Sequence, residues 1–184
     1  MKLMFASDLH GSAFYAKELV RILKEEAPDK CVLLGDLLYH GPRNALPQEY
    51  APMQVVDILK AVKQSFLCVR GNCDAEIDAM VLDMPIEADY AALFIDGHMF
   101  FVTHGHLFNE DKLPMLNNGD VFIQGHTHVS TAENKGDYYF LNPGSLSIPK
   151  DGTNSYMIYE NNLFTIKTLD GTVLKTLDIS GESL

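Results

Sequence analysis

Five apolar stretches of this chain each lead directly into a short polar cluster that contains or adjoins glycine. The clusters are "SDLHG" at 7–11, "GDLLYHG" at 35–41, "GNCD" at 71–74, "HGH" at 104–106 and "GHTH" at 125–128. Ligands of α/β proteins collect at the carboxyl ends of the strands. The spacing therefore predicts that aspartate, asparagine and histidine side chains from distant parts of the chain converge at one edge.

The order of the apolar stretches predicts an α/β fold. In the first half, strands expected at 2–7, 30–34 and 65–69 alternate with two helices, one capped by Ser12 and one with Val55, Val56, Leu59 and Val62 on one face. Alternating strands and helices imply parallel pairing with right-handed crossovers. The second half is nearly all β, with a hairpin signal at Asp96-Gly97. Two sheets packed face to face, with outer helices, would bury all of this in a single domain, 1–184.

Composition restricts the partners of the protein. With 14 Lys and Arg against 25 Asp and Glu, the net charge of −11 argues against long nucleic acid, whose binding depends on clustered basic residues. No apolar run approaches the ~20 residues that span a bilayer, and Asp8 comes too early for a signal peptide. The three cysteines show no repeated pair spacing, which fits a reducing compartment. We therefore expect a cytoplasmic protein without a membrane partner.

Each polar cluster taken alone is most simply a turn or a solvated loop. Taken together they are not, because four of the seven histidines and two aspartates would have to reach one edge by accident. Nitrogen and oxygen donors without thiolate spacing suit Mn²⁺, Fe, Zn²⁺ or Ni²⁺. There are too many donors for one ion, but two metals that share a carboxylate would use them all. Such a pair can hold a bridging hydroxide for in-line attack on phosphorus.

The ordered clusters resemble the five motifs of the calcineurin-like metallophosphoesterases, which read D-x-H, G-D, G-N-H-D/E, H and G-H-x-H. The resemblance runs from Asp8 to about Ser145, and "NPGS" at 142–145 is similar to the compact prokaryotic branch of the family. It implies a four-layer α/β/β/α sandwich, in agreement with the pattern above. "NPGS" itself is most simply a turn, with Asn142 or Ser145 lining the site.

The resemblance also implies a role for each matching residue. One metal would be held by Asp8, His10 and His128, and the other by Asn72, His104 and His126, with Asp36 bridging the two ions. Mn²⁺ is the favoured ion, with Fe, Zn²⁺, Ni²⁺ and Mg²⁺ as alternatives. In the loop after Asp36, Arg43 and Asn44 are either substrate contacts or surface side chains. His106 would support a ligand, and His40 and His98 are expected to be structural.

The chain departs from the family at Cys73, where the motif carries a histidine that assists the leaving group and the phosphate. Cys73 could be a ligand, a nucleophile, half of a disulfide or the occupant of the missing acid's place. Asn72 already fills the ligand position, and a metal-activated hydroxide makes a second nucleophile unnecessary. We therefore expect Cys73 to tune the site without being essential. Nearby cations would lower the pKa of the thiol and make it an unreliable acid.

The resemblance implies a dimetal phosphodiesterase that acts on small phosphodiesters, with Asp36, Asn72, Cys73 and Arg43 at the reaction centre. The alternatives are a phosphomonoesterase and a binding scaffold without catalytic activity, which some small members of this fold have become. All seven ligand positions are filled here, which disfavours the scaffold. Hydrophobic strands late in the chain favour self-association into a homo-oligomer.

Overall fold

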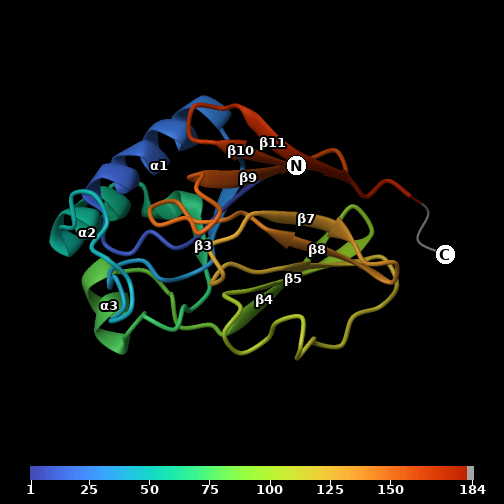
Figure 1. The fold of residues 1–184 in the computed structure, drawn as a ribbon, viewed down its shortest axis with the longest axis horizontal. Coiled ribbons are helices and arrows are strands. Elements are labelled where there is room, and N and C mark those ends of the chain that lie inside the picture. The colour runs from blue at the N-terminus through green and yellow to red at the C-terminus, as the bar shows by residue number, and fades with distance from the viewer. Residues whose placement is uncertain (182–184) are drawn as a thin grey trace.

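The computed structural model describes residues 1–181, which form two mixed β-sheets and three α-helices (Figure 1). The six-stranded sheet has the order β11-β10-β9-β1-β2-β3, and the five-stranded sheet has the order β4-β5-β6-β8-β7. The first sheet consists of β1 (Lys2–Ala6), β2 (Lys30–Leu33), β3 (Phe66–Cys68), β9 (Ser155–Glu160), β10 (Leu163–Thr168) and β11 (Val173–Asp178). The second consists of β4 (Tyr90–Ile95), β5 (His98–Thr103), β6 (Asp120–Ile123), β7 (Thr131–Asn134) and β8 (Tyr138–Asn142).

Parallel pairing is confirmed where the strand and helix alternation predicts it. Strands β1, β2 and β3 pair in parallel, as do β5, β6 and β8 in the other sheet. Strands joined by hairpins pair antiparallel, and β9 also pairs antiparallel with β1, from the other end of the chain. The predicted turns at Asp96-Gly97 and Asn161-Asn162 place both central residues at positive φ, as a two-residue hairpin of type I′ requires.

The helices cover the outer face of the six-stranded sheet and lie together at the left of Figure 1. They are α1 (Ala13–Glu26), α2 (Pro52–Lys60) and α3 (Glu76–Leu82). Leu19 and Ile22 of α1 and Val55 and Leu59 of α2 are buried in one core with Met4 of β1. Ser12 caps α1 as predicted, since its hydroxyl accepts a hydrogen bond from the Tyr15 amide at 3.2 Å.

A second core fills the space between the two sheets, so the predicted face-to-face sandwich is confirmed. A third cluster, Phe101, Phe122 and Phe140, lies on the outer face of the five-stranded sheet. Residues 104–119, all of them described, contain no helix, and their Phe108 and Leu116 cover this cluster. The second outer layer is therefore an irregular segment, because apolar side chains at irregular spacing suffice to bury three rings.

Three details differ from the sequence-based expectations. The pattern did not indicate α3 or β7, because segments of seven and four residues are too short to show a clear periodicity. Val62 lies beyond the end of α2, in the turn before the short 3₁₀ segment Lys63–Ser65.

The late edge strand β11 carries exposed apolar residues, Val173 and Leu174. Within residues 1–181, no helix combines the length and the apolar character that a membrane span needs.

Glu26, at the end of α1, provides a test of how this fold responds to acid. Its carboxylate accepts hydrogen bonds from Lys2, Lys167 and Tyr156, each at 2.8 Å. Burial alone would raise the pKa of Glu26, but these three partners outweigh it and lower the pKa from 4.5 to about 2. A lowered folded-state pKa stabilises the protein above the unfolded-state value, and that contribution is lost as the pH falls from about 5 to about 2.

We expect Glu26→Gln to lower the free energy of unfolding by about 1–3 kcal/mol at pH 7 and by progressively less as the pH falls below 5. Urea titrations of both proteins between pH 3 and pH 7 measure this difference. Glu160→Gln is the control, since Glu160 is exposed at the end of β9 and has no side-chain hydrogen bond among residues 1–181. A difference that is independent of pH would contradict the prediction.

Candidate metal centre

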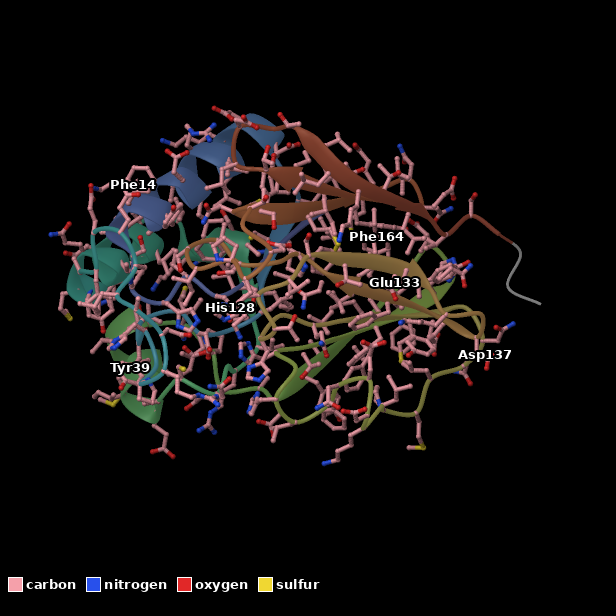
Figure 2. All side chains as sticks on the ribbon, viewed as in Figure 1. Phe14, Tyr39, His128, Glu133, Asp137 and Phe164 are labelled. Carbon is pink, nitrogen blue, oxygen red and sulfur yellow. The ribbon has the colours of Figure 1, made fainter. Side chains whose placement is uncertain are left out.

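All seven predicted ligand residues lie at the carboxyl ends of parallel strands, as the sequence predicts. Asp8 and His10 follow β1, Asp36 follows β2, and Asn72 follows β3. In the other sheet, His104 follows β5, and His126 and His128 follow β6. Figure 2 shows His128 at the end of the sheets that faces α2 and α3, far from Glu133 and Asp137 at the opposite end.

The first group of side chains is Asp8, His10 and His128. The Nε2 atom of His128 lies 3.1 Å from Asp8 Oδ1, and that of His10 lies 3.5 Å from the same oxygen. The two Nε2 atoms are 3.3 Å apart. All three residues are buried, and their potential ligand atoms lie within 4.8 Å of one another. The three side chains therefore present their donor atoms to one small volume.

The second group is Asn72, His104 and His126. His104 Nε2 lies 3.0 Å from Asn72 Oδ1 and 3.2 Å from His126 Nδ1. Asp36 lies between the two groups, since its Oδ2 atom is 3.6 Å from His10 Nε2 and 3.4 Å from His104 Nε2. The Asp36 carboxylate therefore lies within 3.6 Å of a histidine nitrogen from each group.

Backbone carbonyls orient three of the histidine rings. The Nδ1 atoms of His10, His104 and His128 donate to the carbonyls of Tyr39, Leu34 and Ile148 at 2.8, 2.6 and 2.8 Å. A carbonyl can only accept, so Nδ1 carries the proton and the Nε2 lone pair of the neutral ring faces the other ligand atoms. This is the arrangement in which imidazole binds a metal ion.

The electrostatics of the centre favour a cation. Asp8 Oδ1 is fully buried and has no hydrogen bond of good geometry, although a buried carboxylate oxygen normally has one. Burial would raise the pKa of Asp8, but the facing His10 and His128 hold it well below its usual value. Burial would lower the pKa of His104, yet Asp36 and Asp8 raise it to about 9. Both carboxylates thus stabilise positive charge between them, and bound divalent ions would supply that charge.

The backbone of the centre is strained in a way that a core without a function rarely is. Five of the seven residues have positive φ values in the left-handed region, namely Asp8, His10, Asp36, His126 and His128. Residues other than glycine seldom adopt this conformation, and such strain concentrates at functional sites. The surrounding contacts must hold these loops in place.

Asp74 is one such contact, and the sequence motifs alone do not assign it a role. It is buried, and its carboxylate accepts hydrogen bonds from the amides of Asp36, Leu37 and Gly71 at 2.8, 2.9 and 2.7 Å. A Cβ atom on Gly71 would lie 2.1 Å from Asp36 Oδ1, so only glycine permits this approach. The "GNCD" cluster therefore positions Asp36 as well as supplying Asn72. The acidic fourth residue of the family motif was the available signal.

The "NPGS" turn and the neighbouring Ser147 form hydrogen bonds to the loops that carry the predicted ligand residues. The Asn142 side chain donates to the Gly125 carbonyl at 2.8 Å, within the loop that carries His126. The hydroxyls of Ser145 and Ser147 both donate to the Asp8 carbonyl at 2.9 Å. The expected turn is present, and its polar groups are buried supports of the ligand loops.

The remaining histidines have different surroundings. His98 donates from Nδ1 to the Gly119 carbonyl at 2.7 Å, and the His40 ring packs edge-on against Tyr39 and Tyr50, so both have structural contacts. The His106 ring centroid lies 5.5 Å from that of His104, and burial together with His104 lowers the pKa of His106. His106 is thus close enough to contact a ligand histidine without joining either group.

Beside the centre lies an open cavity of about 520 Å³. Ligand residues Asp36, Asn72, His126 and His128 line it, together with Gly41, Pro42, Arg43, Asn44, Cys73, Thr127 and Lys150. Arg43 and Asn44, for which the sequence left substrate contact and surface side chain as alternatives, both line this cavity beside the candidate metal centre. Lys150 was not anticipated, and no motif contains it.

Cys73 lies closer to the centre than the sequence argument assumed. Its Sγ atom is within 4.8 Å of ligand atoms of His10 and Asp36, and its backbone amide donates to Asp36 Oδ1 at 2.8 Å. Burial and the Asp36 carboxylate raise the pKa of the Cys73 thiol to about 12. Distance alone therefore does not exclude the thiol as a ligand.

We expect Cys73→Ala to keep both metals and to retain activity on an activated diester within about tenfold, because all seven predicted ligand residues remain. Cys73→His is expected to help substrates with poor leaving groups, since a general acid contributes about 10²–10⁴-fold. Metal content and kcat/KM across a leaving-group series measure both effects. Loss of a metal or of all turnover in Cys73→Ala would show that the thiol is a ligand or a nucleophile.

A two-sheet sandwich with such a centre at its strand ends defines the class of metallophosphoesterases. The family model described as the calcineurin-like phosphoesterase superfamily domain matches residues 1–162. The chain belongs to the calcineurin-like phosphoesterase superfamily, which confirms the resemblance drawn from the motifs.

Individual relatives agree with this assignment. The chain is 44% identical over 171 residues to phosphodiesterase YfcE of Escherichia coli K12, covering 92% of this chain and 93% of that protein. The solved structure of E. coli YfcE, a phosphoesterase, matches with a TM-score of 0.95 and 43% identity over 98% of this chain and all of that chain. Vps29 of Entamoeba histolytica in complex with Zn²⁺ matches with a TM-score of 0.66 at 22% identity, over 98% of this chain and all of that chain, which shows a shared fold.

Proposed function

We propose that this protein hydrolyses small phosphodiesters with the help of two divalent metal ions. The observation that carries the proposal is the position of Asp36, whose carboxylate lies within 3.6 Å of a histidine from each ligand group. A shared carboxylate between two groups of donors is the arrangement of a two-metal site. The 44% identical relative YfcE is named a phosphodiesterase, which supports the same reaction here.

The residues present fit two ions. Asp8, His10 and His128 would hold one, Asn72, His104 and His126 the other, and Asp36 would bind both. When bound, such ions lower the pKa of water and neutralise charge on the phosphoryl group. Nitrogen and oxygen donors suit Mn²⁺, our favoured ion, and also Fe, Zn²⁺ or Ni²⁺, while Mg²⁺ prefers more oxygen ligands.

The charge of the centre explains how an acidic protein would bind an anionic substrate. Asp8 and Asp36 contribute two negative charges, so two divalent ions leave the centre with a net charge of about +2 when the histidines are neutral. The chain as a whole carries −11. The attraction for phosphate is therefore local, and Arg43 at the same cavity would strengthen it by contacting the phosphoryl oxygens.

Two alternatives make different predictions. A phosphomonoesterase would use the same ions but would depend more on the histidine that assists the phosphate, and Cys73 stands in its place here. A binding scaffold would need neither ions nor Asp36, and the ordered ligand atoms and buried Asp8 argue against it. A cytoplasmic location, self-association and the exclusion of long nucleic acid stay predictions from the sequence.

We expect bis(4-nitrophenyl) phosphate to be hydrolysed about 10²-fold faster than 4-nitrophenyl phosphate, as judged by kcat/KM. The leaving group is the same in both, but the monoester carries one more negative charge, and Cys73 stands where the family has a histidine that assists the phosphate. The assay uses protein freed of metal and then supplied with Mn²⁺, Fe²⁺, Zn²⁺, Ni²⁺ or Mg²⁺ in turn. A faster monoester would favour the monoesterase, and no bound metal with no hydrolysis would favour the scaffold.

A further inference from the structure

The cavity beside the metal centre carries more positive charge than a simple phosphodiester needs. Arg43 and Lys150 both line it, and among residues 1–181 Asp36 is the only carboxylate that does. Neither basic residue has an ion-pair partner within 4.0 Å among residues 1–181, whereas Lys2, Arg21 and Lys167 do. In a chain with a net charge of −11, two cations that face one cavity without a paired carboxylate make this cavity locally positive.

Lys150 is held in this position by the backbone around a ligand histidine. Its amide donates to the His128 carbonyl at 2.9 Å, and the Ile148 carbonyl accepts from His128 Nδ1 at 2.8 Å. The segment 148–150 is thus tied to His128 at two points. Arg43 belongs to a different loop, 41–44. This loop packs against Cys73, since a Cβ atom added at Gly41 would lie 3.2 Å from Cys73 Sγ. The two cations therefore reach the same cavity from separate loops.

The charges and the lining together indicate the kind of substrate. With two divalent ions the centre has a net charge of about +2, and Arg43 and Lys150 raise this to about +4, whereas a simple phosphodiester brings −1. Apart from the histidines of the metal centre, no lining residue is aromatic, so the cavity offers no apolar ring on which a nucleobase could stack. The excess charge calls for a second anionic group on the substrate.

We infer that the natural substrate is a phosphodiester whose second arm carries an anionic group, such as a carboxylate or a further phosphate, and that Lys150 recognises this group. The inference rests on the proposed function and specifies its substrate class. Lys150 is then a specificity-determining residue, and Arg43 remains the contact to the phosphoryl group undergoing hydrolysis.

Two chromogenic diesters test this inference directly. Butyl 4-nitrophenyl phosphate and 3-carboxypropyl 4-nitrophenyl phosphate share a leaving group and an arm of four carbons, and differ in one carboxylate. With Mn²⁺ supplied, we expect the carboxylate ester to have a kcat/KM about tenfold higher, the size expected of one hydrogen bond between charged groups. The preference should weaken as the salt concentration rises.

Variants assign the preference to Lys150. We expect Lys150→Met to reduce the ratio of the two kcat/KM values to about one, and Lys150→Arg to preserve most of it, because the charge is retained. Lys24→Met is the matched control, since Lys24 is exposed on α1 and does not line the cavity. Calorimetric titration with 3-phosphonopropionate and propylphosphonate should show the same loss in Lys150→Met for binding alone.

Each result has a defined meaning. A wild-type ratio near one, or a tenfold ratio that survives in Lys150→Met, would overturn the inference and leave the proposed phosphodiesterase standing. If the wild-type protein hydrolysed neither ester with any of the five metals, the proposed function would fail and the inference with it.

Discussion

Replacing Asp36 by asparagine is expected to abolish hydrolysis of bis(4-nitrophenyl) phosphate and to loosen both metals. The Asp36 carboxylate lies 3.6 Å from His10 Nε2 and 3.4 Å from His104 Nε2, so one side chain serves both ligand groups. Asparagine keeps the shape but removes the charge and one of the two acceptor oxygens. We expect a loss of at least about 10³-fold in kcat/KM, beyond the 10–100-fold typical of residues that only orient a ligand.

Metal content measured by mass spectrometry after dialysis is the readout that separates this role from a purely structural one. Asp57→Asn is the matched control, because Asp57 is exposed on α2 and should leave both metals and turnover unchanged. An Asp36→Asn protein that kept two tightly bound metals and near-normal turnover would show that Asp36 does not bridge the ions.

Asp74→Ala is expected to destabilise the protein by about 3–5 kcal/mol and to weaken metal binding, although Asp74 is not a ligand. Its carboxylate satisfies three buried amides, those of Asp36, Leu37 and Gly71, and each unsatisfied buried donor costs roughly 1–3 kcal/mol. Two of these amides belong to the loop that presents Asp36. Urea unfolding with and without added Mn²⁺ measures both effects.

The control for this change is Asp78→Ala, four residues further along. Asp78 accepts one hydrogen bond, from the Ala75 amide at 2.9 Å, at the solvent-accessible start of α3. Its loss should cost about 1 kcal/mol and leave metal affinity unchanged. Equal destabilisation by the two variants, or an unchanged metal affinity in Asp74→Ala, would refute the positioning role of Asp74.

The fold was largely predictable because its strands are short apolar runs with clear ends. The hairpin at Asp96-Gly97 and the cap at Ser12 depend on local chemistry, and both occur as expected. The helix α3 and the strand β7 were missed since their stability comes from packing and pairing with the rest of the chain, which local periodicity does not contain. The irregular layer at 104–119 was missed for the same reason.

The candidate metal centre divides in the same way. The convergence of the polar clusters followed from the sequence by itself, because parallel strands bring their carboxyl ends to one edge wherever the chain runs in between. The assignment of seven residues as ligands came from the resemblance to the family motifs and stays a prediction. Only the tertiary structure decided that Cys73 comes within 4.8 Å of His10 and that Lys150 reaches the cavity. Parallel strands bring these residues to the same end of the sheets, but the distances between their side chains depend on the loops that follow the strands. Those loops take their shape from long-range hydrogen bonds such as the one from the Lys150 amide to the His128 carbonyl.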